Sequence, residues 1–182
     1  LSGINVNLKS GDSLLIRGPS GCGKTSLLRA LAGLWPFGSS GKVSHPPHHD
    51  ILFLPQRPYT AQGSLRDAIC YPNIDKQHPE LIEAMNTCRL GYLVDKLDKP
   101  DDWQHILSPG ELQRVAFVRA LLSQPKVILL DEATAALDEP TEAMLYRALK
   151  QKLPDSIIIS IGHRSTLNEF HDLCLDVGHV QC

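Results

Sequence analysis

An octapeptide near the N-terminus has the residue types and the spacing of a phosphate-binding loop. Gly18-Pro19-Ser20-Gly21-Cys22-Gly23-Lys24-Thr25 fits the pattern G-x-x-x-x-G-K-[ST] at every fixed position, and Ser26 extends it. The glycines let backbone N–H groups converge on an anion, and the start of a following helix adds partial positive charge. Lys24 would reach the outer phosphates, and the Thr25 hydroxyl would bind Mg²⁺. The alternative is an ordinary strand–turn–helix corner, which the Lys-Thr pair disfavours.

Two carboxylates that directly follow an apolar run suit the same chemistry. Residues 127–130 read as an uninterrupted apolar strand of the kind buried in a parallel sheet, and Asp131 and Glu132 come at its end. Ligands of parallel sheets bind at that edge. Asp131 suits coordination of Mg²⁺ through water, and Glu132 suits polarising a water for attack on a phosphoryl group. The alternative is a strand that simply ends in two acids.

The segment Leu107-Ser108-Pro109-Gly110-Glu111 has the form of a helix start. Ser108 would be the N-cap, Pro109 the first helical residue and Glu111 the partner in a capping box. The Ser108 hydroxyl and the free N–H groups of Gly110 and Glu111 would also form a second anion site. The structural and the functional interpretations are compatible.

Alternating apolar strands and helices must position these segments. Strands are expected at residues 1–8, 13–17, 42–44, 51–54, 127–130, 156–161 and 173–177, and helices at residues 26–34, 110–123 and 140–152. This alternation predicts an α/β fold with a mostly parallel sheet and flanking helices. The helix at residues 110–123 is expected to be strongly amphipathic.

Residues 64–123 interrupt the alternation and are predicted to form a helical subdomain inserted on one side of the sheet. Residues 64–97 read as short helices, with Ser64 capping the first, Pro79 starting the second and Gly91 preceding the third. Residues 98–104 are expected to be a charged loop. The His-rich tract at residues 45–50 invites a metal-binding interpretation, but its prolines favour a solvated loop.

Composition limits the function classes. A chain of 182 residues with 42% hydrophobic and 21% charged residues is typical of one soluble domain, and its net charge of −2 disfavours a nucleic-acid partner. No apolar run approaches the roughly 20 residues of a membrane-spanning helix. Both ends fall beside strand-like stretches, so we expect a domain truncated at both ends. Reduced thiols in a cytosolic compartment are expected for the odd number of cysteines, which are Cys22, Cys70, Cys88, Cys174 and Cys182.

Together these motifs resemble the ATPase cassette of ABC transporters, a P-loop NTPase fold, over nearly the whole chain. The phosphate loop is followed in order by Gln56, the 107–111 segment, Leu-Leu-Asp-Glu at 129–132, Ala-Leu-Asp at 136–138, and His163. Further details resemble the sub-family D half-transporters of peroxisomes and lysosomes and the related bacterial fused permease–ATPases. They are residues 54–59, Trp103, the Ser-Pro-Gly form of the signature, and residues 161–171.

The resemblance implies a role for each matching residue. Residues 18–26 would hold the phosphates of ATP. Thr25, Gln56 and Asp131 would hold Mg²⁺, and Gln56 would also contact the attacking water and relay the nucleotide state to a membrane domain. Lys24 would stabilise charge during catalysis.

The resemblance gives the remaining residues catalytic and coupling roles. Glu132 would be the general base and His163 would sense the γ-phosphate, with a polar strand end as the alternative for His163. Ser108 and Gly110 would contact ATP bound to an opposite cassette. Asp138 would couple the two nucleotide sites, and the N-cap of a helix is an equally good interpretation of it.

The implied function is ATP hydrolysis that drives transport across a membrane. The cassette would pair head to tail with a second cassette and would lie on the cytosolic face, attached to a transmembrane domain of the same transporter. The alternatives are a soluble ABC ATPase that acts on ribosomes or DNA and a degenerate regulatory cassette. Pro109 stands where the family usually carries glycine and removes one backbone donor, which leaves the rate of hydrolysis open. The aromatic residue that stacks on adenine in the family would precede Leu1.

Overall fold

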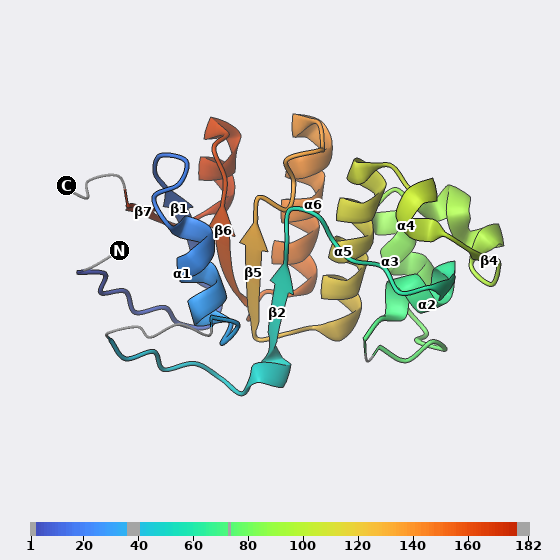
Figure 1. The fold of residues 1–182 in the computed structure, drawn as a ribbon, viewed down its shortest axis with the longest axis horizontal. Coiled ribbons are helices and arrows are strands. Elements are labelled where there is room, and N and C mark those ends of the chain that lie inside the picture. The colour runs from blue at the N-terminus through green and yellow to red at the C-terminus, as the bar shows by residue number, and fades with distance from the viewer. Residues whose placement is uncertain (1–2, 36–40, 73, 178–182) are drawn as a thin grey trace. The chain divides into compact units, whose positions relative to one another are not determined.

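The computed structural model describes residues 3–35, 41–72 and 74–177, and the chain divides into two compact units. The first unit consists of Leu1–Leu54, Pro125–Glu132 and Asp155–Cys182. The second consists of Pro55–Gln124 and Ala133–Pro154. The chain therefore leaves the first unit after two strands, returns to it for a third, and returns once more for the last two (Figure 1).

The first unit is built on a five-stranded parallel sheet with the order β2-β5-β6-β1-β7. Helix α1 (Lys24–Leu31) packs beside it, and two short 3₁₀ helices, η1 (His48–Asp50) and η3 (Ser165–Phe170), complete the unit. The predicted α/β fold with a mostly parallel sheet is confirmed. The strands are β1 (Ser13–Arg17), β2 (Ile51–Leu54), β5 (Val127–Asp131), β6 (Ile157–Ile161) and β7 (Leu173–Asp176).

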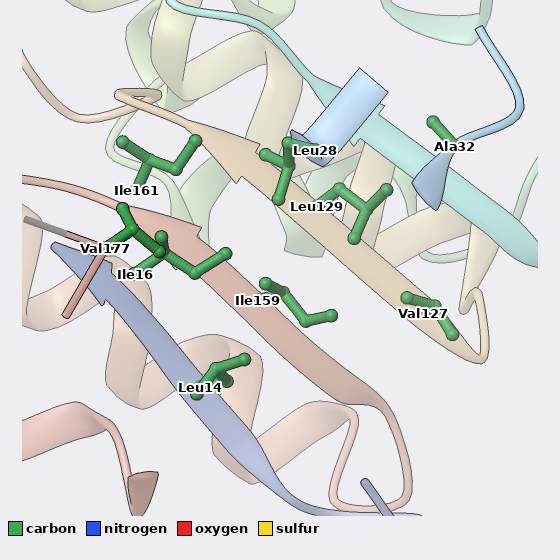
Figure 2. Close-up of a cluster of buried hydrophobic side chains, with 9 residues drawn as sticks. All are labelled: Leu14, Ile16, Leu28, Ala32, Val127, Leu129, Ile159, Ile161 and Val177. Atoms are coloured by element: carbon green, nitrogen blue, oxygen red, sulfur yellow. The ribbon is translucent and has the colours of Figure 1, made fainter. Parts of the chain in front are cut away.

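One face of this sheet carries the apolar core that fixes α1. Leu14 lies opposite Ile159 and Ile16 lies opposite Ile161, so alternate residues of neighbouring strands share a face. Figure 2 shows Leu28 of α1 beside Leu129 of β5 on that face. Burial of these side chains holds the start of α1 at the ends of the strands. The buried cluster comprises Leu14, Ile16, Leu28, Ala32, Val127, Leu129, Ile159, Ile161 and Val177.

Two strands predicted for the first unit are wrong. Residues 3–8 and 42–44 have no regular secondary structure, although Ile4, Val6 and Leu8 alternate as strand residues do. The Ile4 and Val6 side chains are 36% and 41% exposed, and Val43 is 52% exposed. No described strand pairs with either segment, and unpaired extended chain with exposed apolar groups is not stable as a strand. Residues 48–50 of the predicted loop form η1.

The second unit is mainly helical. Helix α5 packs against α2, α3 and α6, and the two-residue strands β3 (Gly63–Ser64) and β4 (Pro100–Asp101) pair antiparallel. The Ser64 cap of α2 is confirmed, with Asp67 completing a capping box. The helices are α2 (Leu65–Cys70), α3 (Leu81–Thr87), η2 (Gly91–Lys96), α4 (Trp103–Ile106), α5 (Pro109–Ser123) and α6 (Glu139–Lys152).

Helix α5 is not amphipathic as predicted, because every residue from Val115 to Leu122 is buried. Packing against three other helices covers it on most sides, as in a helix at the centre of a core. The run includes Arg119, whose guanidinium donates to the carbonyl oxygens of Ala68 at 2.5 Å and Ile69 at 3.3 Å near the end of α2. These two hydrogen bonds partly offset the cost of burying the charge.

Smaller predictions for this unit need correction. The expected loop at residues 98–104 contains β4 and the start of α4, where the buried Trp103 donates its indole N–H to the Lys99 carbonyl at 3.0 Å. Pro79 lies just before Glu80, which is the N-cap of α3, and the element that begins at Gly91 is a 3₁₀ helix. The limits of an inserted helical subdomain at 64–123 remain a prediction.

Four of the cysteines are described, and all four are free thiols: Cys22, Cys70, Cys88 and Cys174. Cys182 lies outside the described residues. Burial raises the pKa of Cys88 to about 12, so this thiol is unreactive at neutral pH.

Among the described residues, no helix is both long enough and apolar enough to cross a bilayer.

Candidate nucleotide-binding site

The phosphate-binding loop is the turn from β1 into α1. Gly18, Gly21 and Gly23 have φ values of 146°, 79° and 97°, which side-chain-bearing residues rarely adopt. A Cβ at Gly18 would also lie 3.0 Å from Cγ2 of Val177 and 3.2 Å from Sγ of Cys22. Gly23 is the N-cap of α1 and has no side chain that could accept hydrogen bonds from the first N–H groups of the helix. This geometry offers the helix start to an anion.

Lys24 holds its charge inside this loop. Its side chain is buried, and Nζ donates to the carbonyl oxygens of Gly18 and Pro19, both at 2.8 Å. Helix α1 begins at Lys24, two residues earlier than predicted, so the ammonium group and the helix N-terminus lie together. An ammonium group held by neutral acceptors at a helix start is suited to binding phosphate oxygens.

Thr25 and Asp131 form a hydrogen-bonded pair of oxygen groups. The Thr25 hydroxyl donates to Oδ1 of Asp131 at 2.9 Å, where β5 ends. Burial raises the pKa of Asp131, the charge of Glu132 raises it further, and the Thr25 hydrogen bond partly opposes this shift. A buried carboxylate beside a hydroxyl is a hard-oxygen donor set, and its charge favours a divalent cation. These residues therefore fit Mg²⁺.

Glu132 and His163 lie together beside this pair. Nε2 of His163 is 3.2 Å from Oε1 of Glu132, and both side chains are partly exposed. Glu132 has a φ of 51°, and its N–H donates to the Ile161 carbonyl at 3.1 Å. A left-handed residue other than glycine costs about 1–3 kcal/mol and is typical of functional sites. The carboxylate is thus held beside the histidine at the ends of two neighbouring strands.

Three adjacent strands bring the predicted residues of the first unit to one edge. Strands β5, β6 and β1 are neighbours and parallel, so their carboxyl ends coincide. Asp131 and Glu132 stand at the end of β5, His163 follows β6, and the loop with Lys24 and Thr25 follows β1. The carboxyl edge of such a sheet is where ligands bind.

The second unit contains the predicted start of α5. Ser108 Oγ accepts the N–H of Glu111 at 3.3 Å, while Oε2 of Glu111 accepts from the N–H and hydroxyl of Ser108 at 2.8 and 2.6 Å. The capping box with Pro109 at the first position is confirmed. The prediction that the N–H of Glu111 is free is wrong, because Ser108 accepts it. Gly110 lies in the same first turn.

Tyr92, in η2, contacts this helix start, and the sequence did not indicate that contact. Its hydroxyl donates to Oε1 of Glu111. Burial raises the pKa of Glu111, but the hydrogen bonds from Ser108 and Tyr92 outweigh it, so the pKa lies below its usual value. Nineteen positions separate Tyr92 from Glu111, and no local spacing rule links them.

Asp138 and Gln56 also belong to the second unit. Oδ1 of Asp138 accepts the N–H of Thr141 at 2.9 Å, which makes Asp138 the N-cap of α6, and hydrogen bonds from Thr141 lower its pKa. A role of Asp138 in coupling two nucleotide sites remains a prediction. Gln56 follows β2 with its side chain exposed.

Comparison with known proteins agrees with the geometry. A family model described as "ABC transporter" matches residues 1–135. The chain is 58% identical over 97% of its length to an ABC transporter ATP-binding protein of Haemophilus influenzae. It is 41% identical over 94% of its length to the human lysosomal cobalamin transporter ABCD4. A bacterial Atm1-family ABC exporter with ATP bound has a TM-score of 0.77 at 26% identity over 94% of the chain.

The matched proteins are longer than this chain. It spans 30% of the Haemophilus protein, 30% of the human protein and 33% of the exporter chain. The sequence resemblance to a transporter cassette, including its sub-family D features, is confirmed.

Proposed function

This chain belongs to the ABC transporter family, and from that membership we propose that it binds and hydrolyses ATP with Mg²⁺ to drive transport of a substrate across a membrane. The observation that carries the proposal is the cluster of Lys24, Thr25, Asp131, Glu132 and His163 at one sheet edge. It combines a phosphate site, a cation site and a base within one unit.

The residues of the first unit divide the chemistry among them. Lys24 and the loop amides hold the phosphates and offset charge that develops on the transferred phosphoryl group. Glu132 accepts a hydrogen bond from the attacking water and takes its proton, while His163 keeps the carboxylate oriented and contacts the γ-phosphate. Mg²⁺ held by Thr25 and Asp131 would supply further neutralisation of phosphate charge, and Gln56, the third ligand that the family resemblance implies, belongs to the second unit.

The second unit supplies the contacts between cassettes. We assign Ser108 and Gly110 to the γ-phosphate of ATP bound to a second cassette paired head to tail, and Asp138 to coupling of the two sites. A transmembrane domain of the same transporter would hold the cassettes at the cytosolic face of the membrane. The Ser108 hydroxyl already donates its one proton to the Glu111 carboxylate at the start of α5. To donate to a phosphate, it must give up this hydrogen bond or share the proton between the two acceptors.

Steady-state hydrolysis of Mg²⁺-ATP by the intact transporter in liposomes tests the proposal. The wild type is expected to turn over ATP and to move its substrate, and Lys24→Ala is expected to lose both activities. A wild-type protein that binds ATP without turnover would instead be a regulatory cassette. Turnover without any dependence of transport on ATP would exclude the role in transport.

A further inference from the structure

Gln113 joins two segments of the second unit that carry predicted site residues. It lies on the second turn of α5, and its side chain is buried, with 2% exposed. Nε2 donates to the main-chain carbonyl of Gln56 at 2.9 Å, and Oε1 accepts the main-chain N–H of Ala136 at 2.9 Å. One amide therefore contacts the segment after β2 and the segment before Asp138.

The orientation of this amide follows from its partners. A carbonyl oxygen can only accept a hydrogen bond, and a main-chain N–H can only donate one. The NH₂ group must face Gln56 and the oxygen must face Ala136, because the reverse arrangement would place like groups together at both ends. Both partners are main-chain atoms, so the link holds the backbone itself.

Gly110 adds a second contact on the same side of α5. Residues three apart on a helix are neighbours, so Gly110 and Gln113 lie on one face. A Cβ at Gly110 would lie 3.2 Å from the Ala136 carbonyl oxygen and 3.3 Å from Cδ2 of Leu137. Residues 136–137 therefore pack closely against the first turn of α5 and are held there by the Gln113 amide.

We propose that Gln113 is a positioning residue that holds the Gln56 segment and residues 136–138 in one register against the start of α5. It rests on the proposed function, because that function gives Gln56, Ser108 and Asp138 their roles at the nucleotide. A buried amide with both ends satisfied resists displacement, since moving either segment would leave a buried polar group unpaired. Movement of one segment is thereby coupled to the other.

A second glutamine in the same unit provides a matched control. Oε1 of Gln104 accepts from both the N–H and the hydroxyl of Thr60, each at 2.9 Å. Like Gln113, it ties a segment close to Gln56 to a helix near the start of α5. Its described hydrogen bonds go to Thr60, not to residues 136–138, so it lacks the link on which the proposal depends.

Steady-state ATPase kinetics of Gln113→Met in the intact transporter test the role. Methionine has a similar size and can form neither hydrogen bond. We expect kcat to fall about tenfold and KM for ATP to stay within about twofold of wild type, because the phosphate loop is untouched. Gln113→Asn, which is too short to reach both partners, is expected to show the same split. Should Gln113→Met not fold, a folded Gln113→Asn protein with the wild-type kcat would overturn the proposal.

A double-mutant cycle with Asp138→Ala separates positioning from a general effect on stability. If Gln113 acts through residues 136–138, Asp138→Ala should lower kcat much less in the Gln113→Met protein than in the wild type. In the control pair, Gln104→Met and Asp138→Ala, the fold reductions in kcat should multiply in the double variant. If the fold reductions for Gln113→Met and Asp138→Ala also multiply, the proposal is overturned. A wild type without ATPase activity would be a failure of the proposed function, whereas an active wild type with an unaffected Gln113→Met variant would be a failure of this inference alone.

Discussion

Nε2 of His163 lies 3.2 Å from Oε1 of Glu132, across the carboxyl ends of two neighbouring strands. Glu132 holds its carboxylate from a left-handed backbone, and Gly162, next to His163, is packed so closely that a Cβ there would lie 2.2 Å from Cδ1 of the buried Leu167. The fold therefore holds this acid–imidazole pair from both sides.

Replacement of His163 by alanine should slow hydrolysis without loss of ATP binding. The change removes the group that orients Glu132 but leaves the phosphate loop intact, so turnover should fall about 10²-fold. Another histidine–carboxylate pair, His105 and Asp102, is 2.8 Å apart and highly exposed, and His105→Ala is the control. ATPase rates and nucleotide binding measure both. Equal rates for wild type and His163→Ala would remove the histidine from the reaction.

Replacement of Asp131 by asparagine should stabilise the nucleotide-free protein while weakening its binding of Mg²⁺. Burial raises the pKa of Asp131 in the folded state, so above that pKa the ionised carboxylate destabilises the fold, and this cost disappears as the pH falls through the folded pKa. The melting temperature of the variant should exceed that of the wild type at pH 7.5, and the difference should shrink toward pH 4. A lower melting temperature at pH 7.5 would contradict the account.

Replacement of Pro109 by glycine should tighten ATP-driven dimerisation of a hydrolysis-blocked protein. It restores one N–H at the start of α5, and a hydrogen bond to a charged group contributes about 1.5–3 kcal/mol. Glycine costs roughly 0.5–1 kcal/mol in helix stability, so the gain should exceed the loss. Pro109→Ala restores the same donor without the glycine penalty. If neither variant tightens the dimer, the donor at position 109 does not face nucleotide.

Replacement of Leu28 by alanine should destabilise the first unit strongly. This side chain is fully buried between α1 and the sheet, and similar truncations cost about 2–5 kcal/mol (Figure 2). Leu34→Ala is the matched control, because Leu34 is 59% exposed and its truncation should lower the free energy of unfolding little. Urea unfolding measures the free energy of unfolding of both variants. Similar values for the two would place Leu28 outside the core.

The first-unit site could be predicted from sequence because its parts are local. The phosphate loop is one continuous segment, and Asp131 and Glu132 directly follow an apolar strand, so strand order alone brings them together. The capping boxes at Ser64 and Ser108 were predictable for the same reason, since each spans four residues.

The missed features depend on tertiary contacts. Tyr92 meets Glu111 only through folding of the second unit, and Gln113 reaches across 57 positions to Gln56. Helix α5 was expected to be amphipathic, but it is buried on most sides, and even its Arg119 donates to carbonyl oxygens inside the unit. The strand expected at residues 1–8 has the right alternation, but its described part, residues 3–8, lacks a described partner strand.

The ATPase rate of Glu132→Gln tests the central claim most directly. Glutamine keeps the size of the side chain and removes the base, so Mg²⁺-ATP should still bind while turnover falls by at least about 10²-fold. Glu139→Gln, at an exposed acid in the first turn of α6, should keep the wild-type rate. Retained ATP binding with lost turnover is the predicted result. Turnover within a few-fold of wild type would contradict the assignment of Glu132 as the base and the account of this site.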